Sequence, residues 1–465
     1  MTMGKRDSEQ QQDLFITHDK LPRSPGHVFY RKLNQLLAAG GFDRWIEGLC
    51  EPYYCQGQGR PSVPPGQYFR MLLVGYFEGI NSQRGIAWRC SDSLSLREFL
   101  GIPLGEESPD HSSLSYIRNR LPHSVHEAVF VWVLALAHEK KLLKGQTVAV
   151  DSTTLEANAA MKSIVRKDTG EDWKEYLTRL MKEAGLIEDD DNPPNDGALR
   201  KFDKARENKK VSNEEWTSPS DPDSRIARMK DGTTHLAYKA EHVVDLDTEV
   251  ILAAEIYPAD YADTATLEDS LHQAQINQKE AGSEQEIKDA VADKGYHSAQ
   301  ALANLREHTP YRTYIPEPER RHQCVWTDKP PEQKQAVVAN RRRARGNRGR
   351  KLQRLRSERV ERTFAHVCET GGARRTWLTG IEKVRKRYLL SAAAHNLGVL
   401  MRSLFKMGTP RGLQQFRLDL EWVVSSLYLA WVAALPPWKL SYLFTAPPHA
   451  LCDSLLPEVQ PALAV

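Results

Sequence analysis

The chain has 465 residues and a formal net charge of +3, so it can form two or three domains, and its overall charge neither indicates nor excludes a nucleic-acid partner. Six scattered cysteines exclude a disulfide scaffold, and Cys50 and Cys55 lack a second Cys or His pair at zinc-ligand spacing. The polar N-terminus predicts no signal peptide, and the most apolar stretches (128–137 and 422–435) are shorter than the roughly 20 residues that cross a bilayer. We therefore expect a protein of the reducing cytoplasm without a membrane segment.

The first third of the chain shows helical periodicity. Residues 1–27 are polar and are expected to be disordered, and apolar residues then recur at three- and four-residue steps. In the segment SPDHSSLSYIRNRL, Asp110 or Ser112 stands where a helix N-cap is expected. Residues 28–144 are therefore predicted to form a compact all-helical domain.

Strand-like and helical segments alternate from residue 145 onward. The strand-like runs are 146–150, 236–244, 250–256 and 287–292, and the helical runs between and after them are 267–281 and 298–307. This alternation predicts an α/β domain over 145–402. A polar, turn-rich stretch at about 166–228 is predicted to be an insertion or mobile loop, and residues 403–465 a helical C-terminal extension.

Three carboxylates stand in unusual contexts. Asp151 in TVAVDSTTLEANA and Asp293 in DAVADKGYHS each close a short apolar run that predicts a strand, and Glu361 in SERVERTFAH follows a basic segment with helical spacing. Carboxylates from two strand ends and a helix can hold two divalent cations beside a phosphodiester. Taken singly, each Asp is more often a turn or cap residue, and Glu361 more often pairs with Arg362 or Arg356. Only the combination indicates a metal site.

Positive charge is concentrated just before Glu361, where a helix is expected to begin near Gly349. Contact with DNA phosphates is one interpretation of this segment, and a solvated loop or a localisation-like tract is the alternative. About six phosphate contacts would make binding fall steeply with salt. The cations are Arg341, Arg342, Arg343, Arg345, Arg348, Arg350, Lys351, Arg354 and Arg356.

Three residues beside the second Asp and one beyond the Glu are further candidates. Lys294, Tyr296 and His297 follow Asp293 and either position a phosphate or pack the strand end. His366, five positions after the Glu, is expected to pack rather than to carry protons, since two-metal chemistry needs no histidine base.

In these segments the chain resembles bacterial insertion-sequence transposases of the DDE type. The matching words extend from about Phe29 to Arg402 and are PDHSSLSYIRNRL, VAVDSTTLEANA, SDPDSRIARMKDG, HLAYKAEHVVD, ADKGYHS, SERVERTFAHVCETGGARRTWLTG and AHNLGVLMR. The resemblance implies a ribonuclease H-like mixed-sheet catalytic domain behind an N-terminal all-helical DNA-binding domain.

The same resemblance implies that Asp151, Asp293 and Glu361 are catalytic ligands of two Mg²⁺ ions, with Mn²⁺ as a substitute. Asp151 would bridge both ions from the first strand, Asp293 would come from the fourth strand, and Glu361 from the helix behind it. Glu358, one turn earlier, is the rival third ligand, although the word VERTF favours Glu361.

The resemblance also implies DNA contacts. Related transposases often place Lys or Arg seven positions after the Glu, but Cys368 stands there, so Arg374 and Arg375 are the candidate substitutes. Arg118 and Arg120 belong either to a helix that reads the major groove or to the charged outer face of a packed helix.

The implied function is a DNA transposase that binds terminal inverted repeats, cleaves at the ends and joins the 3′ ends to target DNA. Its partner would be double-stranded DNA, on which it would act as a homodimer in the nucleoid. Two alternatives remain: a metal-dependent nuclease of the same fold without strand transfer, and a catalytically dead DNA-binding regulator.

Overall fold

The computed structural model describes residues 27–55, 61–188, 194–206, 212–229, 232–319, 326 and 329–410. By their internal contacts, the described residues up to Gly408 form one compact unit. The predicted disordered N-terminus (all but residue 27), the predicted C-terminal extension beyond 410 and the apolar stretch 422–435 lie outside the described residues. Within these ranges, no helix combines the length and the apolar character that a membrane span requires.

The N-terminal region is helical, as predicted. Asp110 is the N-cap of α6, where its side chain accepts a hydrogen bond of 2.8 Å from the Ser112 amide. Buried aromatic residues, among them Phe29, Phe69 and Phe130, fill the core between the helices. The helices are α1 (Val28–Ala39), α2 (Phe42–Cys50), α3 (Pro65–Glu78), α4 (Gln83–Asp92), α5 (Leu94–Leu100), α6 (His111–Arg120) and α7 (His123–Glu139).

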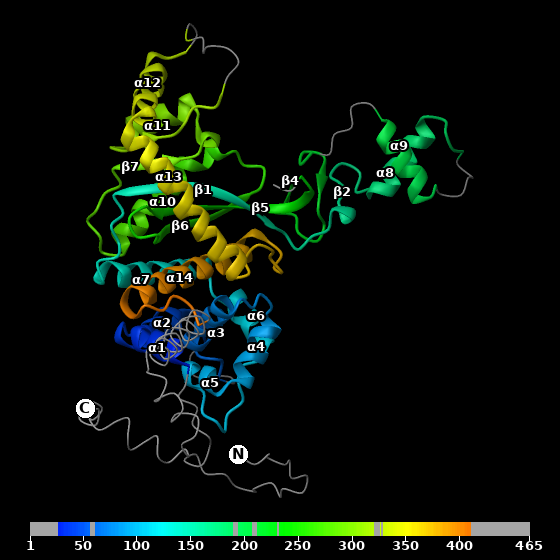
Figure 1. Ribbon diagram of the computed structural model, residues 1–465. Helices are drawn as coiled ribbons and strands as arrows, with labels where there is room; N and C mark the ends of the chain where they lie inside the picture. Colours follow the sequence, from blue (N-terminus) through cyan, green and yellow to red (C-terminus); the bar gives the residue numbers. More distant parts are fainter. Residues whose placement is uncertain are drawn as a thin grey trace, which may run out of the picture. The chain divides into compact units, whose positions relative to one another are not determined.

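A six-stranded mixed sheet follows the helical region (Figure 1). Strand β5 lies at a branch point, pairing antiparallel with β1 on one side and with β4 and β6 along its other side. Strands β1, β7 and β8 are parallel to one another in that order. The strands are β1 (Thr147–Glu156), β4 (Arg225–Arg228), β5 (Thr234–Asp245), β6 (Ile251–Pro258), β7 (Asp289–Ala292) and β8 (Arg312–Tyr314).

The first strand is longer than the sequence predicts, so the expectation that Asp151 closes it is wrong. Strand β1 has ten residues and continues to Glu156 because the polar segment after Asp151 stays paired with β5, up to Glu156 opposite Ala237. The predicted hairpin of β5 and β6 is confirmed. Strand β7 is the fifth of this sheet in chain order rather than the fourth, since the short strand β4 precedes β5.

Helices cover both faces of the sheet. Helix α10 (Asp263–Glu280) lies on one face, where its Thr266 hydroxyl donates to Glu241 of β5. Helices α13 (Asn347–Phe364) and α14 (Ile381–Phe405) lie on the other face, and both reach His242 of β5. Helices α11 (Ala299–His308) and α12 (Pro331–Arg345) pack together beside β8.

Helix α14 joins the helical region to the sheet, because it packs on α7 and α3 as well as on β6. Its buried residues extend from Val384 to Met401. The helix continues past the predicted boundary at residue 402 and ends where Lys406 takes a left-handed conformation with a φ of 60°.

The polar stretch predicted to be an insertion or mobile loop contains ordered elements. Helix α8 (Trp173–Glu183) begins with a capping box between Asp172 and Glu175, and it packs on α9 (Asp196–Ala205). Leu177, Met181 and Leu199 form a small core of their own. A two-stranded sheet of β2 (Val165–Arg166) and β3 (Trp216–Thr217) lies in the same stretch. These elements are ordered, which speaks against the mobile-loop alternative, whereas the insertion stays a prediction.

A buried carboxylate fixes the start of β1. Asp245, at the end of β5, is fully buried and accepts hydrogen bonds from the amides of Lys144, Gly145 and Asp247. Burial raises the pKa of this carboxyl despite its three backbone donors. The side chain thus ties the end of the helical region to the turn between β5 and β6.

Substitution of Asp245 by Ala is expected to lower the free energy of unfolding by about 3 kcal/mol, because buried amides would lose their acceptor. Urea denaturation measures the change. Asp247→Ala, an exposed residue of the same turn, is the matched control and should change stability by less than about 0.5 kcal/mol. Equal effects of the two substitutions would contradict the role assigned to Asp245.

Candidate active site

Asp151 and Asp293 lie side by side at one end of the parallel strands. The pairing of β1 with β7 ends at Val150 opposite Ala292, and each Asp is the next residue of its chain. Asp151 remains in β1, whereas Asp293 leaves β7 as the N-cap of a short 3₁₀ turn (Lys294–Tyr296). The fold therefore brings together two carboxylates that are far apart in the sequence.

A guanidinium lies between the two carboxylates. Arg356 of α13 places Nη1 2.6 Å from Oδ2 of Asp151 and Nη2 3.8 Å from Oδ1 of Asp293. Its side chain is 12% exposed, against 23% for Asp151 and 47% for Asp293. One cation thus balances two adjacent acids in a half-buried setting. The sequence offered no signal for this residue beyond its place in the basic segment.

Gln353 positions Arg356 and the helix that carries it. Gln353 Nε2 donates to the carbonyl oxygens of Ala292 (3.1 Å) and Tyr314 (2.6 Å), the last residues of β7 and β8. Its Oε1 accepts a hydrogen bond of 3.2 Å from Arg356 Nε. A single amide side chain therefore fixes α13 over the strand ends and orients the guanidinium.

Glu361 lies on the same helix but outside this contact. Its carboxylate is exposed and accepts a hydrogen bond of 3.3 Å from the Ser357 hydroxyl. It forms no ion pair with the described residues, because Arg356 contacts the two Asp residues and Arg362 pairs with Glu358 and Glu249. Among the residues that the structure describes, no three acidic, His or Cys side chains are close enough to hold a metal ion together.

Glu358, the rival of Glu361, forms an ion pair with Arg362. The Glu358 carboxylate lies 2.7 Å from Arg362 Nη2 at i, i+4 spacing and is 58% exposed. This is an ordinary surface pair of one helix.

A buried histidine of β5, the strand that pairs with β1 on the side opposite β7, contacts α13. His242 lies opposite Asp151 in the pairing of β1 with β5, and its ring stacks on Phe364 at 4.1 Å. Nδ1 lies 3.0 Å from the Thr363 hydroxyl, and Nε2 lies 2.8 Å from the Tyr388 hydroxyl. Because Thr363 donates to the Val360 carbonyl, its oxygen is left to accept from Nδ1–H. Burial lowers the pKa of His242 well below its usual value, so the ring is neutral.

Of the residues that follow Asp293, Tyr296 packs in the core on the other side of the sheet. It is 1% exposed, and its hydroxyl donates to Glu241 at 2.7 Å. Lys239 lies 3.3 Å from the same carboxylate and 2.7 Å from Asp263. Lys294 is exposed beside Asp293. The sequence left packing and phosphate positioning open here, and for Tyr296 the contacts are those of packing.

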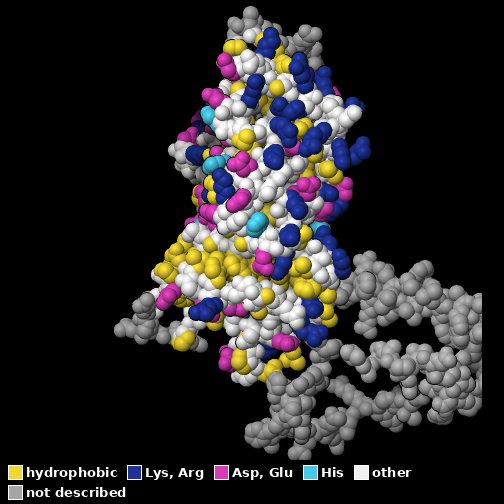
Figure 2. Space-filling model, turned by 90° about the vertical axis from the view of Figure 1, so that its left-hand side faces the viewer, with side chains coloured by type: hydrophobic (Ala, Val, Ile, Leu, Met, Phe, Trp, Pro, Cys, Tyr) yellow, Lys and Arg dark blue, Asp and Glu magenta, His cyan; other side chains and the backbone are white. Residues whose placement is uncertain are grey.

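The basic segment consists of two helices rather than one helix from Gly349. Helix α12 ends at Arg345 and α13 begins at Asn347. Arg341 pairs with Glu317, Arg343 donates to the Thr313 carbonyl, and Arg348 pairs with Asp289. Figure 2 shows Lys and Arg side chains gathered at the height of α11 and α12 in Figure 1. The exposed cations of the segment are Arg342, Arg345, Arg348, Arg350, Lys351 and Arg354.

Cys368 lies in the core. The residues Ala365–Thr370 form a π-helical turn after α13. The Cys368 thiol is buried, and its Sγ lies 3.9 Å from the Tyr388 hydroxyl oxygen. Burial raises the pKa of this thiol to about 11. His366, on the same turn, packs against the ring of His395 at 5.5 Å.

Arg374 reaches the face of β1 that carries Asp151. Its Nη1 donates to the Thr153 hydroxyl at 2.8 Å, and residues 151 and 153 share a face because side chains alternate along a strand. It also pairs with Glu369 at 2.8 Å. Arg375 lies over the ring of Trp377, with 5.0 Å between the guanidinium carbon and the ring centroid.

The two arginines of α6 differ in environment. Arg120 is exposed and lies over the Tyr54 ring at 4.7 Å. Arg118 is half-buried against Tyr68, and burial lowers its pKa. Of the two arginines on the predicted recognition helix, only Arg120 is therefore exposed.

Comparison with protein families gives two matches. Residues 17–120 match the family described as "Transposase domain (DUF772)", and residues 318–401 match the family described as "Transposase DDE domain". The second match includes Arg356 and Glu361. No curated protein and no solved structure matches the chain.

Replacement of Arg356 by Gln is expected to destabilise the protein in EDTA by about 1–2 kcal/mol, because Asp151 and Asp293 would face each other without a cation. Added Mn²⁺ should then raise the melting temperature of the variant more than that of the unmodified protein, since no guanidinium competes for the carboxylates. Arg354→Gln, an exposed arginine on the same helix, is the control. An equal response to Mn²⁺ in both variants would contradict this interpretation.

Proposed function

Because its two matched domains make the chain an insertion-sequence transposase of the DDE type, we propose that it binds terminal inverted repeats, cleaves at the ends and joins the 3′ ends to target DNA. The adjacency of Asp151 and Asp293 around one cationic group is the observation that carries this proposal. The partner is double-stranded DNA, held by a homodimer so that two ends meet.

The order of the strands supports a ribonuclease H-like fold for the catalytic part. Strands β6, β5 and β1 pair antiparallel in that order, and β7 and β8 extend the sheet in parallel with β1. The two aspartates then lie on the central strand and directly after its parallel neighbour, where the family's ligands are expected.

The donor set fits divalent cations. Two carboxylates already converge on a positive guanidinium, and carboxylate oxygens are the ligands that Mg²⁺ and Mn²⁺ prefer. Asp151 and Asp293 would hold the ions, with Glu361 as the third ligand from α13. When bound, two such ions supply an activated oxygen nucleophile and stabilise the departing 3′ oxygen.

The protein's own side chains would bind and orient the DNA. Arg374, held at Thr153 on the Asp151 face of β1, is placed to contact a phosphate near the acids, whereas the buried Cys368 is not. Lys294 is exposed beside Asp293, and the exposed cations of α12 and α13 offer further phosphate contacts. Arg356 would move from the carboxylates to the DNA once cations replace it.

Substitution of each acid tests the site. Asp151→Asn, Asp293→Asn and Glu361→Gln should each lower cleavage of terminal-repeat DNA by more than about 100-fold, because a direct metal ligand matters more than its surroundings. Affinity for the ends, measured by gel shift, should stay nearly unchanged. Glu358→Gln is the matched control and should remain active. An active Glu361→Gln together with an inactive Glu358→Gln would move the third ligand to Glu358.

A supercoiled plasmid supplied with element ends distinguishes strand transfer from simple cleavage. Products in which the ends are joined to the plasmid support the transposase. Nicking without joined products would favour a nuclease, and end binding without Mg²⁺- or Mn²⁺-dependent cleavage would favour a DNA-binding regulator.

The basic segment has its own test. Replacement of Arg342, Arg350 and Arg354 by Gln should weaken binding to all DNA sequences alike. The slope of the logarithm of affinity against the logarithm of salt concentration should become shallower by up to about 0.9 for each phosphate that the variant no longer binds. Arg341→Gln, whose guanidinium already pairs with Glu317, should have a smaller effect. A decrease of affinity for the terminal repeats alone would contradict backbone contact by this segment.

A further inference from the structure

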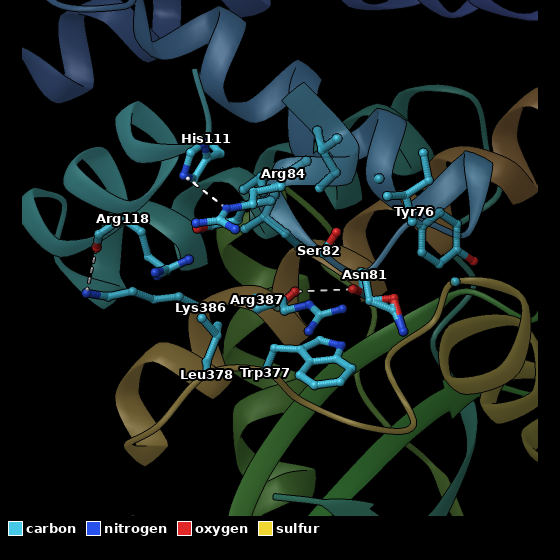
Figure 3. A pocket seen from close by; sticks show the side chains of 18 of the residues that line it. Tyr76, Asn81, Ser82, Arg84, His111, Arg118, Trp377, Leu378, Lys386 and Arg387 are labelled. Atoms are coloured by element: carbon cyan, nitrogen blue, oxygen red, sulfur yellow. Dashed lines mark hydrogen bonds between the residues drawn. The ribbon is translucent and has the colours of Figure 1, made fainter. Parts of the chain in front are cut away.

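A cavity of about 360 Å³ lies between the N-terminal helices and the chain that follows the π-helical turn (Figure 3). Arg84 enters it from α4, Arg118 from α6, and Lys386 and Arg387 from α14. Trp377, which is 51% exposed, lies on its rim below Arg387 in the figure. The volume of the cavity exceeds that of a single water molecule and falls in the range of small-molecule sites.

The cavity holds more positive charge than its surroundings balance. No carboxylate is among the described residues that line it. Arg118 Nε is buried with no hydrogen-bond partner among the described residues, and Arg387 Nη2 donates to the Gly372 carbonyl at 3.2 Å. Lys386, unlike these two arginines, has a counterion, because its ammonium group pairs with Glu382 at 2.6 Å.

The positively charged guanidinium groups of Arg118 and Arg387 repel each other. Burial, and then the charge of Arg118, lower the pKa of Arg387 to about 10, so that both side chains are charged at neutral pH. Half-buried like charges without a counterion are unfavourable, and they persist where an anion completes the site.

The residues that line the cavity favour a phosphate group over other anions. Guanidinium groups present planar pairs of N–H donors that match phosphate oxygens. The N-terminus of α4, capped by Ser82, also faces the cavity and adds a partial positive charge. Apolar and aromatic residues of the lining, among them Tyr68, Leu72, Ile86 and Leu390, accommodate the organic part of a phosphate ester.

We propose that this cavity is a phosphate-binding site, with Arg118 and Arg387 as its principal donors, and that it takes a backbone phosphate of DNA. The source of the phosphate rests on the proposed function. The segment that carries Trp377 hydrogen-bonds to the end of β1, where the Glu156 amide donates to Arg374 and the Thr376 amide donates to Glu156. DNA bound here would therefore be continuous with DNA near Asp151, and the helical region would share in holding it.

The first experiment needs neither metal nor DNA. The full chain is melted in EDTA with increasing inorganic phosphate against chloride at equal ionic strength. A saturable rise of the melting temperature in phosphate is expected, because a ligand that binds only the folded state stabilises it. Absence of this rise overturns the site and leaves the proposed function standing.

Variants then assign the effect to the cavity. Arg118→Met and Arg387→Met should each abolish the phosphate-induced rise, whereas Arg31→Met, on the exposed surface of α1, should keep it. Arg387→Lys retains charge and should retain part of the rise, so it serves if the Met variant does not fold. An unchanged rise in folded Met variants would place the phosphate elsewhere and overturn the proposal.

A DNA-binding arm identifies the source of the phosphate. With duplex DNA, Arg118→Met and Arg387→Met should weaken binding about tenfold and lower the salt slope by about 0.9, whereas Arg31→Met should not. If these variants no longer show the phosphate-induced rise but their DNA affinity equals that of the unmodified protein, the ligand is a free phosphate ester, and the assignment to DNA is overturned.

Discussion

The parallel pairing of β1 with β7 is the constraint on which the candidate site depends. This pairing ends at Val150 of β1 and Ala292 of β7, so the next residues along the chain, at positions 151 and 293, lie beside each other. Both of these residues are aspartates, and two carboxylates at this spacing repel each other unless a cation lies between them. The backbone pairing, rather than any attraction between the acids, holds them together. Arg356 shows what such a site requires, because its guanidinium contacts both carboxylates.

The position of α13 is set by contacts on both sides of Arg356. Gln353 binds the last carbonyls of β7 and β8, and Phe364 stacks on His242 of β5. His242 also reaches Tyr388 of α14, so the helix with Arg356 and Glu361 is fixed to the sheet and to its neighbouring helix. Since His242 stays neutral when buried, this connection needs no counterion.

Local pattern predicted much of the fold, and the failures have identifiable causes. The helical region, the β5–β6 hairpin and the N-cap at Asp110 follow from periodicity and capping, which are local. The length of β1 does not, because its polar second half is held in the sheet by β5. The helix α8 was missed although its capping box was visible, because the surrounding composition is polar.

The candidate site was predictable in part. The two aspartates could be selected from strand-like contexts and from family resemblance, but the contact of Arg356 with Asp151 joins residues 205 positions apart. No spacing rule in the sequence connects such a pair. The buried guanidiniums of the cavity were equally hidden, because the helical pattern that includes Arg118 suits an outer face as well as an inner one.

The π-helical turn after α13 reorients the rest of the chain. In a regular α-helix, the residue seven positions after Glu361 would point within about 20° of the same direction. The wider turn at Ala365–Thr370 changes this phase, and Cys368 faces the interior instead of sharing the outer face of Glu361. A long cationic side chain at position 368 would therefore point into the core, and in the proposed function the phosphate contact comes instead from Arg374, in the segment that begins at Gly371.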